Sequence, residues 1–335
     1  MRAILVRSHG GPEVLRAAEV PDPEPGPGEA VVDVETAGVN FIDVHHRSGR
    51  YPVPLPFVPG QEGAGTVREV GPGVTEVEAG RRVGWVNVPG AYAERALIPA
   101  DRLVPLPDGI STRTAAAVLL QGMTAHYLVD DTCRVRPGDT VLVHAAAGGM
   151  GLLLTQLVKL RGGQVIGTVS TPEKEKAARE AGADHVIRYT EQEVAPAVRE
   201  ITSGAGVAAV LDGIGAPTFD VGLASLRPRG VLALYGQAAG PVPPLDLQRL
   251  NSGGSLFVTR PNLDHHIASR DELQARARDV LAWVLDGRLR VRVDGVRPLN
   301  EAAIVHNRLE QRRSIGKLLI SCSEDRLGCG ASEPI

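Results

Sequence analysis

The amino-acid sequence predicts an α/β protein in which a β-rich unit, antiparallel or barrel-like, accompanies a doubly wound parallel sheet. Three observations support this prediction. The chain has 335 residues, 43% of them hydrophobic, which is enough for two domains with sizeable cores. Roughly the first 120 residues contain short segments rich in β-branched residues, with Gly and Pro between them. After Thr124, strand-like apolar segments alternate with helical ones.

Composition and charge argue against several classes of function. The net charge of −3 gives no basic footprint for nucleic acid, and no apolar run is long enough to span a membrane. Arg2 and Arg7 flank only four apolar residues, too few for the core of a signal peptide. Three cysteines form neither a disulfide framework nor a four-thiolate zinc site. We therefore expect a soluble, cytoplasmic protein.

The alternating part of the sequence predicts a parallel sheet, because strand, helix and strand at this spacing imply right-handed crossovers. Pro172 suits the first turn of a helix and Gly182 the position just past its end. The predicted strands are 140–145, 164–169, 185–187, 207–211 and 231–235, and the predicted helices are 151–160 and 172–181.

Two helices are predicted near the C-terminus. Ser269 and Glu272 form a capping-box pattern before the first, and Gly287 fits its C-terminal end. The second is expected at 301–311, capped by Asn300. The polar, glycine-containing residues 322–335 are expected to form a loosely held tail.

The stretch "VLVHAAAGGMG" (141–151) places glycines where a strand turns into a helix. A dinucleotide's pyrophosphate binds at such a turn, against free backbone N–H groups and the positive end of the helix dipole. Gly148 and Gly151 match the second and third glycines of the G-x-G-x-x-G fingerprint, while Ala146 replaces the first. The alternative is an ordinary turn with no ligand.

The residues after the next strand favour NADPH over NADH. An acidic residue for the ribose 2′-hydroxyl is expected there in NAD-binding proteins. This chain has Ser170 and Thr171 instead, with Lys174 just beyond, and hydroxyls and a cation suit a 2′-phosphate. The sequence contains only four lysines, so a lysine at this place is notable. The alternative is a solvated lysine on a helix face.

Six segments extend the argument to nearly the whole chain: "AGVNFID" (37–43), "RSGRYPVPLPFVPGQEGAGTV" (47–67), "LLQGMTAHYL" (119–128), "HAAAGGMG" (144–151), "AGADHVI" (181–187) and "GSLFVTRP" (254–261). With them the sequence resembles the medium-chain dehydrogenases/reductases, and more narrowly the zinc-independent quinone oxidoreductases related to zeta-crystallin. The resemblance implies a GroES-like, partly open β-barrel catalytic domain (1–123 and 261–321) and an inserted Rossmann NADPH-binding domain (124–260), with the cofactor in the cleft.

The resemblance also implies the site residues. Catalytic candidates are Asn40, His45 and Tyr51, although His45 could instead replace an aromatic wall without chemical function. The residues expected to bind the cofactor are Asn40, Asp43, Thr124, Gly148, Gly149, Met150, Ser170, Lys174, Tyr189, Gly236, Gln237, Phe257, Thr259 and Arg312. Arg313 beside Arg312 leaves the register of that last residue open by one.

Zinc is not expected. Relatives in the alcohol dehydrogenase branch hold catalytic zinc with a cysteine and a histidine, and the matching residues here are Asn40 and Gln61. Neutral amides are poor zinc ligands.

The function implied is hydride transfer from NADPH to a quinone or related electron-poor acceptor. The alternatives are an enone or enoyl-thioester reductase and a non-catalytic NADPH-binding protein. A homodimer is expected through the segment "SLFVTRP" (255–261) as an edge strand, with no nucleic-acid or membrane partner.

Overall fold

The structure, a computed structural model, describes residues 1–323 and divides into two compact units. Of the described residues, the first unit comprises 1–120 and 267–323, and the second comprises 121–266. Cys322, expected in the tail, is buried in the first unit with its Sγ 3.4 Å from the carbonyl oxygen of Ala91. The rest of the expected tail, from residue 324, lies outside the described residues.

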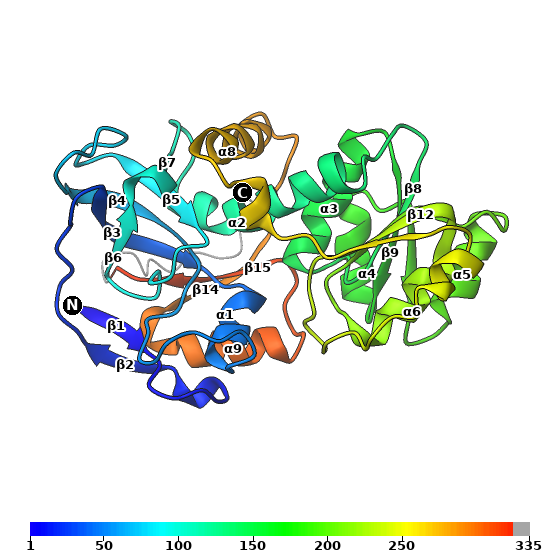
Figure 1. Cartoon of the computed structure of the whole chain (residues 1–335), viewed down its shortest axis with the longest axis horizontal. Helices are drawn as coiled ribbons and strands as arrows, with labels where there is room; N and C mark the ends of the chain where they lie inside the picture. Colours follow the sequence, from blue (N-terminus) through cyan, green and yellow to red (C-terminus); the bar gives the residue numbers. More distant parts are fainter. Residues whose placement is uncertain (324–335) are drawn as a thin grey trace. The chain divides into compact units, whose positions relative to one another are not determined.

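The first unit is built on a mostly antiparallel sheet with the order β14-β15-β3-β4-β5-β7 and β6 on β3 (Figure 1). Only β14 and β15 are parallel among these pairs. A separate hairpin pairs β1 with β2. The strands are β1 (Arg2–Leu5), β2 (Arg16–Glu19), β3 (Glu29–Gly38), β4 (Glu62–Val70), β5 (Arg82–Val86), β6 (Arg95–Pro99), β7 (Val104–Pro105), β14 (Val293–Pro298) and β15 (Lys317–Ser321). In the described residues no pairing closes this sheet, which confirms the partly open barrel.

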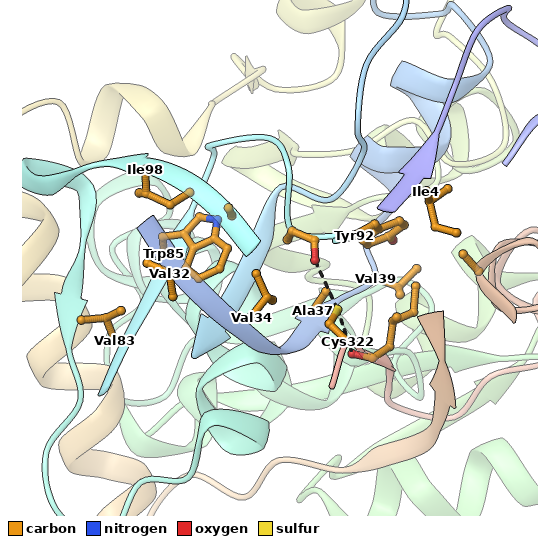
Figure 2. Close-up of a cluster of buried hydrophobic side chains, with 14 of the residues drawn as sticks. Ile4, Val32, Val34, Ala37, Val39, Val83, Trp85, Tyr92, Ile98 and Cys322 are labelled. Carbon is orange, nitrogen blue, oxygen red and sulfur yellow. Dashed lines mark hydrogen bonds between the residues drawn. The ribbon is translucent and has the colours of Figure 1, made fainter. Parts of the chain in front are cut away.

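The core of the first unit lies along β3. Its apolar residues pack with those of the neighbouring strands, as Figure 2 shows for Val32 beside Trp85 and for Val39 near Tyr92. Trp85 is fully buried, and its ring lies against Gly63 across the β4–β5 pair. A Cβ on Gly63 would lie 2.4 Å from Cζ2 of Trp85, so glycine makes room for the indole there.

Helices complete the first unit: α1 (Phe41–Arg47), α8 (Arg270–Leu285) and α9 (Ala302–Glu310), while α2 (Thr112–Tyr127) contains the boundary between the units. The predicted capping box of Ser269 and Glu272 at α8 is confirmed. The predicted cap of α9 is wrong: Asn300 lies inside a 3-10 turn after Pro298, and Glu301 precedes the helix. Within residues 1–323, no helix combines the length and apolarity needed to cross a bilayer.

The second unit contains a parallel sheet in the order β10-β9-β8-β11-β12-β13, the predicted doubly wound arrangement (Figure 1). Its strands are β8 (Thr140–Val143), β9 (Gln164–Val169), β10 (His185–Arg188), β11 (Val207–Asp212), β12 (Leu226–Leu234) and β13 (Phe257–Thr259). Its helices are α3 (Gly149–Leu160), α4 (Pro172–Glu180), α5 (Val194–Ile201), α6 (Ala216–Ser225) and α7 (Gln248–Ser252). The strand order reverses between β8 and β11, and ligands of such sheets bind beyond the carboxyl ends of the strands at this point.

The Gly63–Trp85 contact gives a test of packing in the first unit. We expect Gly63→Ala to lower the free energy of unfolding by about 1–3 kcal/mol, because the added methyl must displace a buried ring. Gly295→Ala, in strand β14, is the matched control, since its Cβ would meet no atom within 4 Å. Chemical denaturation measures both, and equal stabilities of the two variants would contradict the proposed role of Gly63.

Candidate functional site

The glycine segment of the second unit forms a tight turn between β8 and α3. Ala145 takes a positive φ of 51°, and the N–H of Gly148 donates to its carbonyl oxygen at 2.9 Å. Gly148 is the N-cap of α3, and no side chain caps this helix end. The first N–H groups of a twelve-residue helix therefore lack an intrahelical partner beside the carboxyl end of β8. Such an end attracts anions.

The three glycines of this turn have different structural roles. A Cβ on Gly151 would lie 2.3 Å from the carbonyl oxygen of Ala145, so the helix can pack against the turn only with glycine here. A Cβ on Gly149 would lie 2.3 Å from Oε1 of Gln121. A Cβ on Gly148 would have one neighbour within 4 Å, the same Ala145 oxygen at 3.3 Å. Of the three glycines, Gly148 is therefore the one whose backbone is least enclosed by its neighbours.

Ala146, which replaces the first glycine of the fingerprint, is accommodated by a glycine elsewhere. Its methyl group is buried, and its N–H donates to the carbonyl oxygen of Thr168 in β9 at 3.0 Å. A Cβ on the adjacent Gly167 would lie 2.7 Å from the Cβ of Ala146. Gly167 in β9 therefore leaves room for the Ala146 methyl, which a glycine at the first position of the fingerprint would not need.

Ser170, Lys174 and Tyr189 gather beyond the carboxyl ends of β9 and β10. The N–H of Tyr189 donates to the carbonyl oxygen of Val169, the last residue of β9, at 3.1 Å. The ammonium of Lys174 lies 3.4 Å from Oγ of Ser170. Thr171 caps α4 by accepting from the N–H of Lys174. The structure thus brings two hydroxyls, a cation and a half-exposed tyrosine ring to the edge that also holds the glycine turn.

The other predicted residues of the second unit are spread around the same edge. Gly236 and Gln237 follow β12, and Thr259 ends β13. Phe257 begins the same strand, two residues from its carboxyl end, and is 59% exposed. Thr124 lies in α2 and Met150 in the first turn of α3, both partly buried.

Two residues that the sequence analysis missed support this edge. Asp212, at the end of β11, accepts from the N–H groups of Ile214 and Gly215 and from the hydroxyl of Thr218 at 2.7, 3.2 and 2.8 Å. His144, just before the glycine turn, has Nδ1 3.1 Å from the Thr168 hydroxyl. Burial lowers the pKa of His144, so a neutral ring joins β8 to β9. For Asp212 the available signal was a polar residue at a strand end directly before a glycine. His144 is also a polar residue at the end of a strand, but three alanines separate it from Gly148.

In the first unit, Asn40 and Asp43 are fixed at the start of α1. The carboxylate of Asp43 accepts from the backbone N–H of Asn40 and of Gln61, both at 2.9 Å, and from the Tyr92 hydroxyl at 3.3 Å. Asp43 is fully buried, and Asn40 is 4% exposed. The Asp43 oxygens therefore hold the start of α1 and the chain just before β4 inside the unit, and the expected role of Asp43 at the cofactor stays a prediction.

A buried ion pair lies beside Asn40, and sequence reasoning missed it. The ammonium of Lys317 is 2.6 Å from Oε2 of Glu62 and 2.7 Å from Oδ1 of Asn40. Nδ2 of Asn40 donates to the same Glu62 oxygen at 2.8 Å, and the N–H of Leu120 donates to the other at 2.7 Å. The scarcity of lysine was the one sequence signal, since Lys317 is one of four.

Three aromatic side chains lie together after Asn40. The ring of Tyr51 meets that of His45 edge-on at 4.9 Å between centroids and that of His46 at 6.3 Å. His45 is 6% exposed, and Tyr51 is partly exposed. Burial lowers the pKa of His46, so its ring is neutral at pH 7. The structure therefore brings the predicted Tyr51 and His45 into contact.

Arg312, the last predicted site residue, lies in the first unit just after α9. It is exposed and has a positive φ of 57°. Its N–H donates to the carbonyl oxygen of Leu309 at 3.0 Å, and Arg313 beside it is also exposed.

The amide groups of Asn40 and Gln61 do not form a metal-binding arrangement. Oδ1 of Asn40 accepts from an ammonium, and Nε2 of Gln61 lies 3.4 Å from Nδ1 of His46. Across residues 1–323, no cluster of three or more His, Cys, Asp or Glu side chains is placed to hold a metal ion. The donor set present at this place is suited to an ammonium.

Comparison with known proteins agrees with the two-unit fold. Residues 26–108 match the family described as the alcohol dehydrogenase GroES-like domain, and residues 149–279 match that described as zinc-binding dehydrogenase. Quinone oxidoreductase of Pseudomonas aeruginosa is 42% identical over 95% of this chain and 99% of its own length. The chain belongs to the quinone oxidoreductases of the medium-chain dehydrogenase/reductase superfamily. It is therefore an oxidoreductase by family.

Other members of this family extend the comparison. The 2-haloacrylate reductase of a Burkholderia species is 42% identical over 95% of this chain and 98% of its own length. A mycobacterial protein solved with NADPH is 48% identical over 96% of this chain and 99% of that one, with a TM-score of 0.93. Escherichia coli quinone oxidoreductase, also solved with NADPH, is 39% identical over 96% and 100%, with a TM-score of 0.94.

Asp43 and its neighbours form a hydrogen-bonded chain of buried titratable groups. Burial raises the pKa of Asp43 to about 7, against the opposing effect of its two backbone donors and Lys317. The Tyr92 hydroxyl links this carboxyl to Nε2 of His306 at 3.1 Å. Burial, together with the charge of Arg47, lowers the pKa of His306 to about 3 and keeps it neutral. Among these hydrogen-bonded groups, Asp43 is therefore the one that loses or gains a proton near pH 7.

We expect the free energy of unfolding to fall as pH rises from about 4 to about 7, owing to Asp43. Its folded pKa of about 7 lies above the unfolded value of 3.8. Between these two pH values the folded protein holds a proton that the unfolded chain has lost, so the stabilisation is complete below pH 3.8 and is lost as the pH rises through 7. One such group gives at most about 1.4 kcal/mol per pH unit. Asp43→Asn should remove this slope, whereas Asp108→Asn, at an exposed site, should keep it. Denaturant titrations at several pH values measure it, and parallel curves for all three proteins would contradict the assignment.

Proposed function

We propose that the protein is an NADPH-dependent, zinc-independent reductase of quinones and related electron-poor acceptors. The observation that carries the proposal is the uncapped start of α3 with an unobstructed Gly148, on the same edge of the sheet as the hydroxyl of Ser170 and the ammonium of Lys174. NADPH supplies the hydride in such a reaction. The two family members solved with NADPH support the choice of cofactor.

In this proposal the second unit is the NADPH-binding domain. Backbone N–H groups at Gly148, Gly149 and Met150 hold the pyrophosphate, because that helix end attracts anions and Gly148 leaves its approach open. Ser170, Lys174 and Tyr189 hold the 2′-phosphate. We also assign further residues to the cofactor. From the second unit these are Thr124, Gly236, Gln237 and Thr259, and from the first unit they are Arg312 and Asn40.

The first unit is then the catalytic domain, and its contribution is position and a proton. Tyr51 is partly exposed and its ring packs on His45, so it offers both a flat surface for an aromatic acceptor and a hydroxyl. His45 is 6% exposed and serves as the wall behind Tyr51. Quinones are readily reduced, so a site with few acids suffices.

The chemistry around Asn40 supports zinc independence. A divalent cation bound by this carboxamide would lie beside the Lys317 ammonium, which is already 2.7 Å from Oδ1. The two like charges would repel each other in a buried site. The residues present therefore do not fit zinc, although one of the two matching families is described by it.

A second candidate is reduction of an activated carbon–carbon double bond, as in a haloacrylate or an enone. The similarity to 2-haloacrylate reductase, equal to that of the quinone oxidoreductase, favours it. We also propose a cytoplasmic homodimer joined through β13, whose Phe257 is 59% exposed at the edge of the sheet.

The function is tested by NADPH oxidation with a simple quinone, a 2-haloacrylate and an enone, each with and without a strong chelator. We expect turnover of the quinone that the chelator leaves unchanged. Gly148→Ala is the matched negative variant: its methyl meets one backbone atom at 3.3 Å, so the fold should persist while NADPH binding is lost. NADPH binding without turnover of any acceptor would favour a non-catalytic protein, and loss of activity with the chelator would contradict zinc independence.

Cofactor choice is tested at Lys174. A charge-assisted contact to the 2′-phosphate is worth about 1.5–3 kcal/mol, or roughly tenfold to hundredfold in affinity. Lys174→Ala should weaken NADPH by this amount and leave NADH nearly unchanged. Lys176→Ala, on the same helix with a side chain 79% exposed, is the control. The ratio of the two dissociation constants is measured, and an unchanged ratio in Lys174→Ala would assign the preference to other residues.

A further inference from the structure

The buried pair of Lys317 and Glu62 is unusual in its setting. Lys317 is 2% exposed and Glu62 is fully buried, whereas the three other lysines of the sequence, all in the described part, are not buried. Removing two charges from water is costly, and an apolar pair of similar volume often stabilises a core equally well. Stability alone therefore gives a weak reason for this pair.

The surrounding backbone is shaped to hold the pair. A Cβ on Gly38 would lie 2.3 Å from Oε2 of Glu62 and 2.3 Å from the carbonyl oxygen of Ala116. The carboxylate therefore occupies the space of a missing side chain at the end of β3. Its other oxygen accepts from the N–H of Leu120 in α2, so both ends of the group are fixed.

The pair imposes a polarity on the Asn40 carboxamide. An ammonium can only donate hydrogen bonds, and an ionised carboxylate can only accept them. Oδ1 of Asn40 must therefore face Lys317, and Nδ2 must face Glu62, at 2.7 and 2.8 Å. In a flipped carboxamide, Nδ2 would face the Lys317 ammonium, donor against donor, and Oδ1 would face the Glu62 carboxylate, acceptor against acceptor.

We infer that Lys317 and Glu62 are positioning residues that orient Asn40 and so fix the start of α1. Asn40 precedes this helix, and its own N–H is held by Asp43. The helix carries His45, against which the Tyr51 ring packs. The C-terminal strand β15 thereby controls the acceptor wall through one ammonium. This inference rests on the proposed function only in assigning that wall to an acceptor.

The test compares Lys317→Met, the double variant Lys317→Met/Glu62→Gln, and Lys159→Met. The single variant leaves a buried carboxylate without its cation and should unfold at lower temperature. The double variant removes both charges, so its melting temperature should recover toward wild type. We expect its kcat with a quinone to stay about tenfold to hundredfold low, since small misplacements have such effects. Its KM for NADPH should change less than about twofold.

Lys159→Met breaks an ion pair of 2.7 Å with Asp184 in the second unit and should alter neither kcat nor the start of α1. A double variant that regains both melting temperature and kcat would show a purely structural pair and overturn the inference. If the double variant does not fold, Glu62→Gln alone, which keeps the side-chain volume, takes its place. Its melting temperature should fall, because the buried Lys317 ammonium loses its anion, and its kcat should be low at temperatures where it is folded. Wild-type kcat in folded Glu62→Gln would overturn the inference.

A second readout is independent of turnover. In ¹⁵N-labelled protein, the side-chain amide of Asn40, assigned by its loss in Asn40→Leu, should be protected from exchange in the wild type. It should lose protection in the double variant. Retained protection would overturn the positioning role. If the double variant loses protection and the wild type reduces no acceptor, the orientation of Asn40 by the ion pair is supported and the proposed function is rejected.

Discussion

The arrangement of the first unit depends on the burial of one carboxylate, that of Glu62. A buried charge must find donors, and this one has three: the Lys317 ammonium, the Asn40 carboxamide and the backbone N–H of Leu120. These donors come from β15, from the start of α1 and from α2, so a single group ties the C-terminal strand to two helices. If one of these three elements were displaced, the buried carboxylate would lose a donor, so the three elements are coupled through this one group.

The second unit meets a different constraint, which is close approach of backbone to backbone. Gly151 lets α3 pack on the turn, and Gly167 makes room for the methyl of Ala146. Because Gly151 and Gly167 make the close contacts of this turn, Gly148 is left unobstructed at the uncapped start of α3. A helix end with free N–H groups attracts an anion, so the same local geometry that closes the fold also provides a place for a phosphate.

The sequence was sufficient for those features that are local. The parallel strands and the glycine turn were predicted because period, Pro and Gly signal them within a few residues. The predicted cap of α9 was wrong because Asn300 lies inside a 3-10 turn after Pro298, and nothing in the spacing of the sequence indicated that turn. The partners of Asn40 could not be predicted from spacing, since Lys317 is 277 residues away and approaches through sheet pairing. For the same reason the sequence did not predict that Asp43 accepts from the backbone N–H of Gln61, 18 residues away.

The polar groups around Asn40 balance one another. The neutral amides of Asn40 and Gln61 bring no negative charge that could balance a metal ion. In this chain the Lys317 ammonium satisfies Oδ1 of Asn40 and the Glu62 carboxylate instead, so the pocket is electrostatically complete from within. In the zinc-independent enzyme proposed above, this site supplies no Lewis acid to an alkoxide. Under the proposed function, it therefore suits acceptors that take a hydride readily and need only a surface, a proton and a fixed geometry.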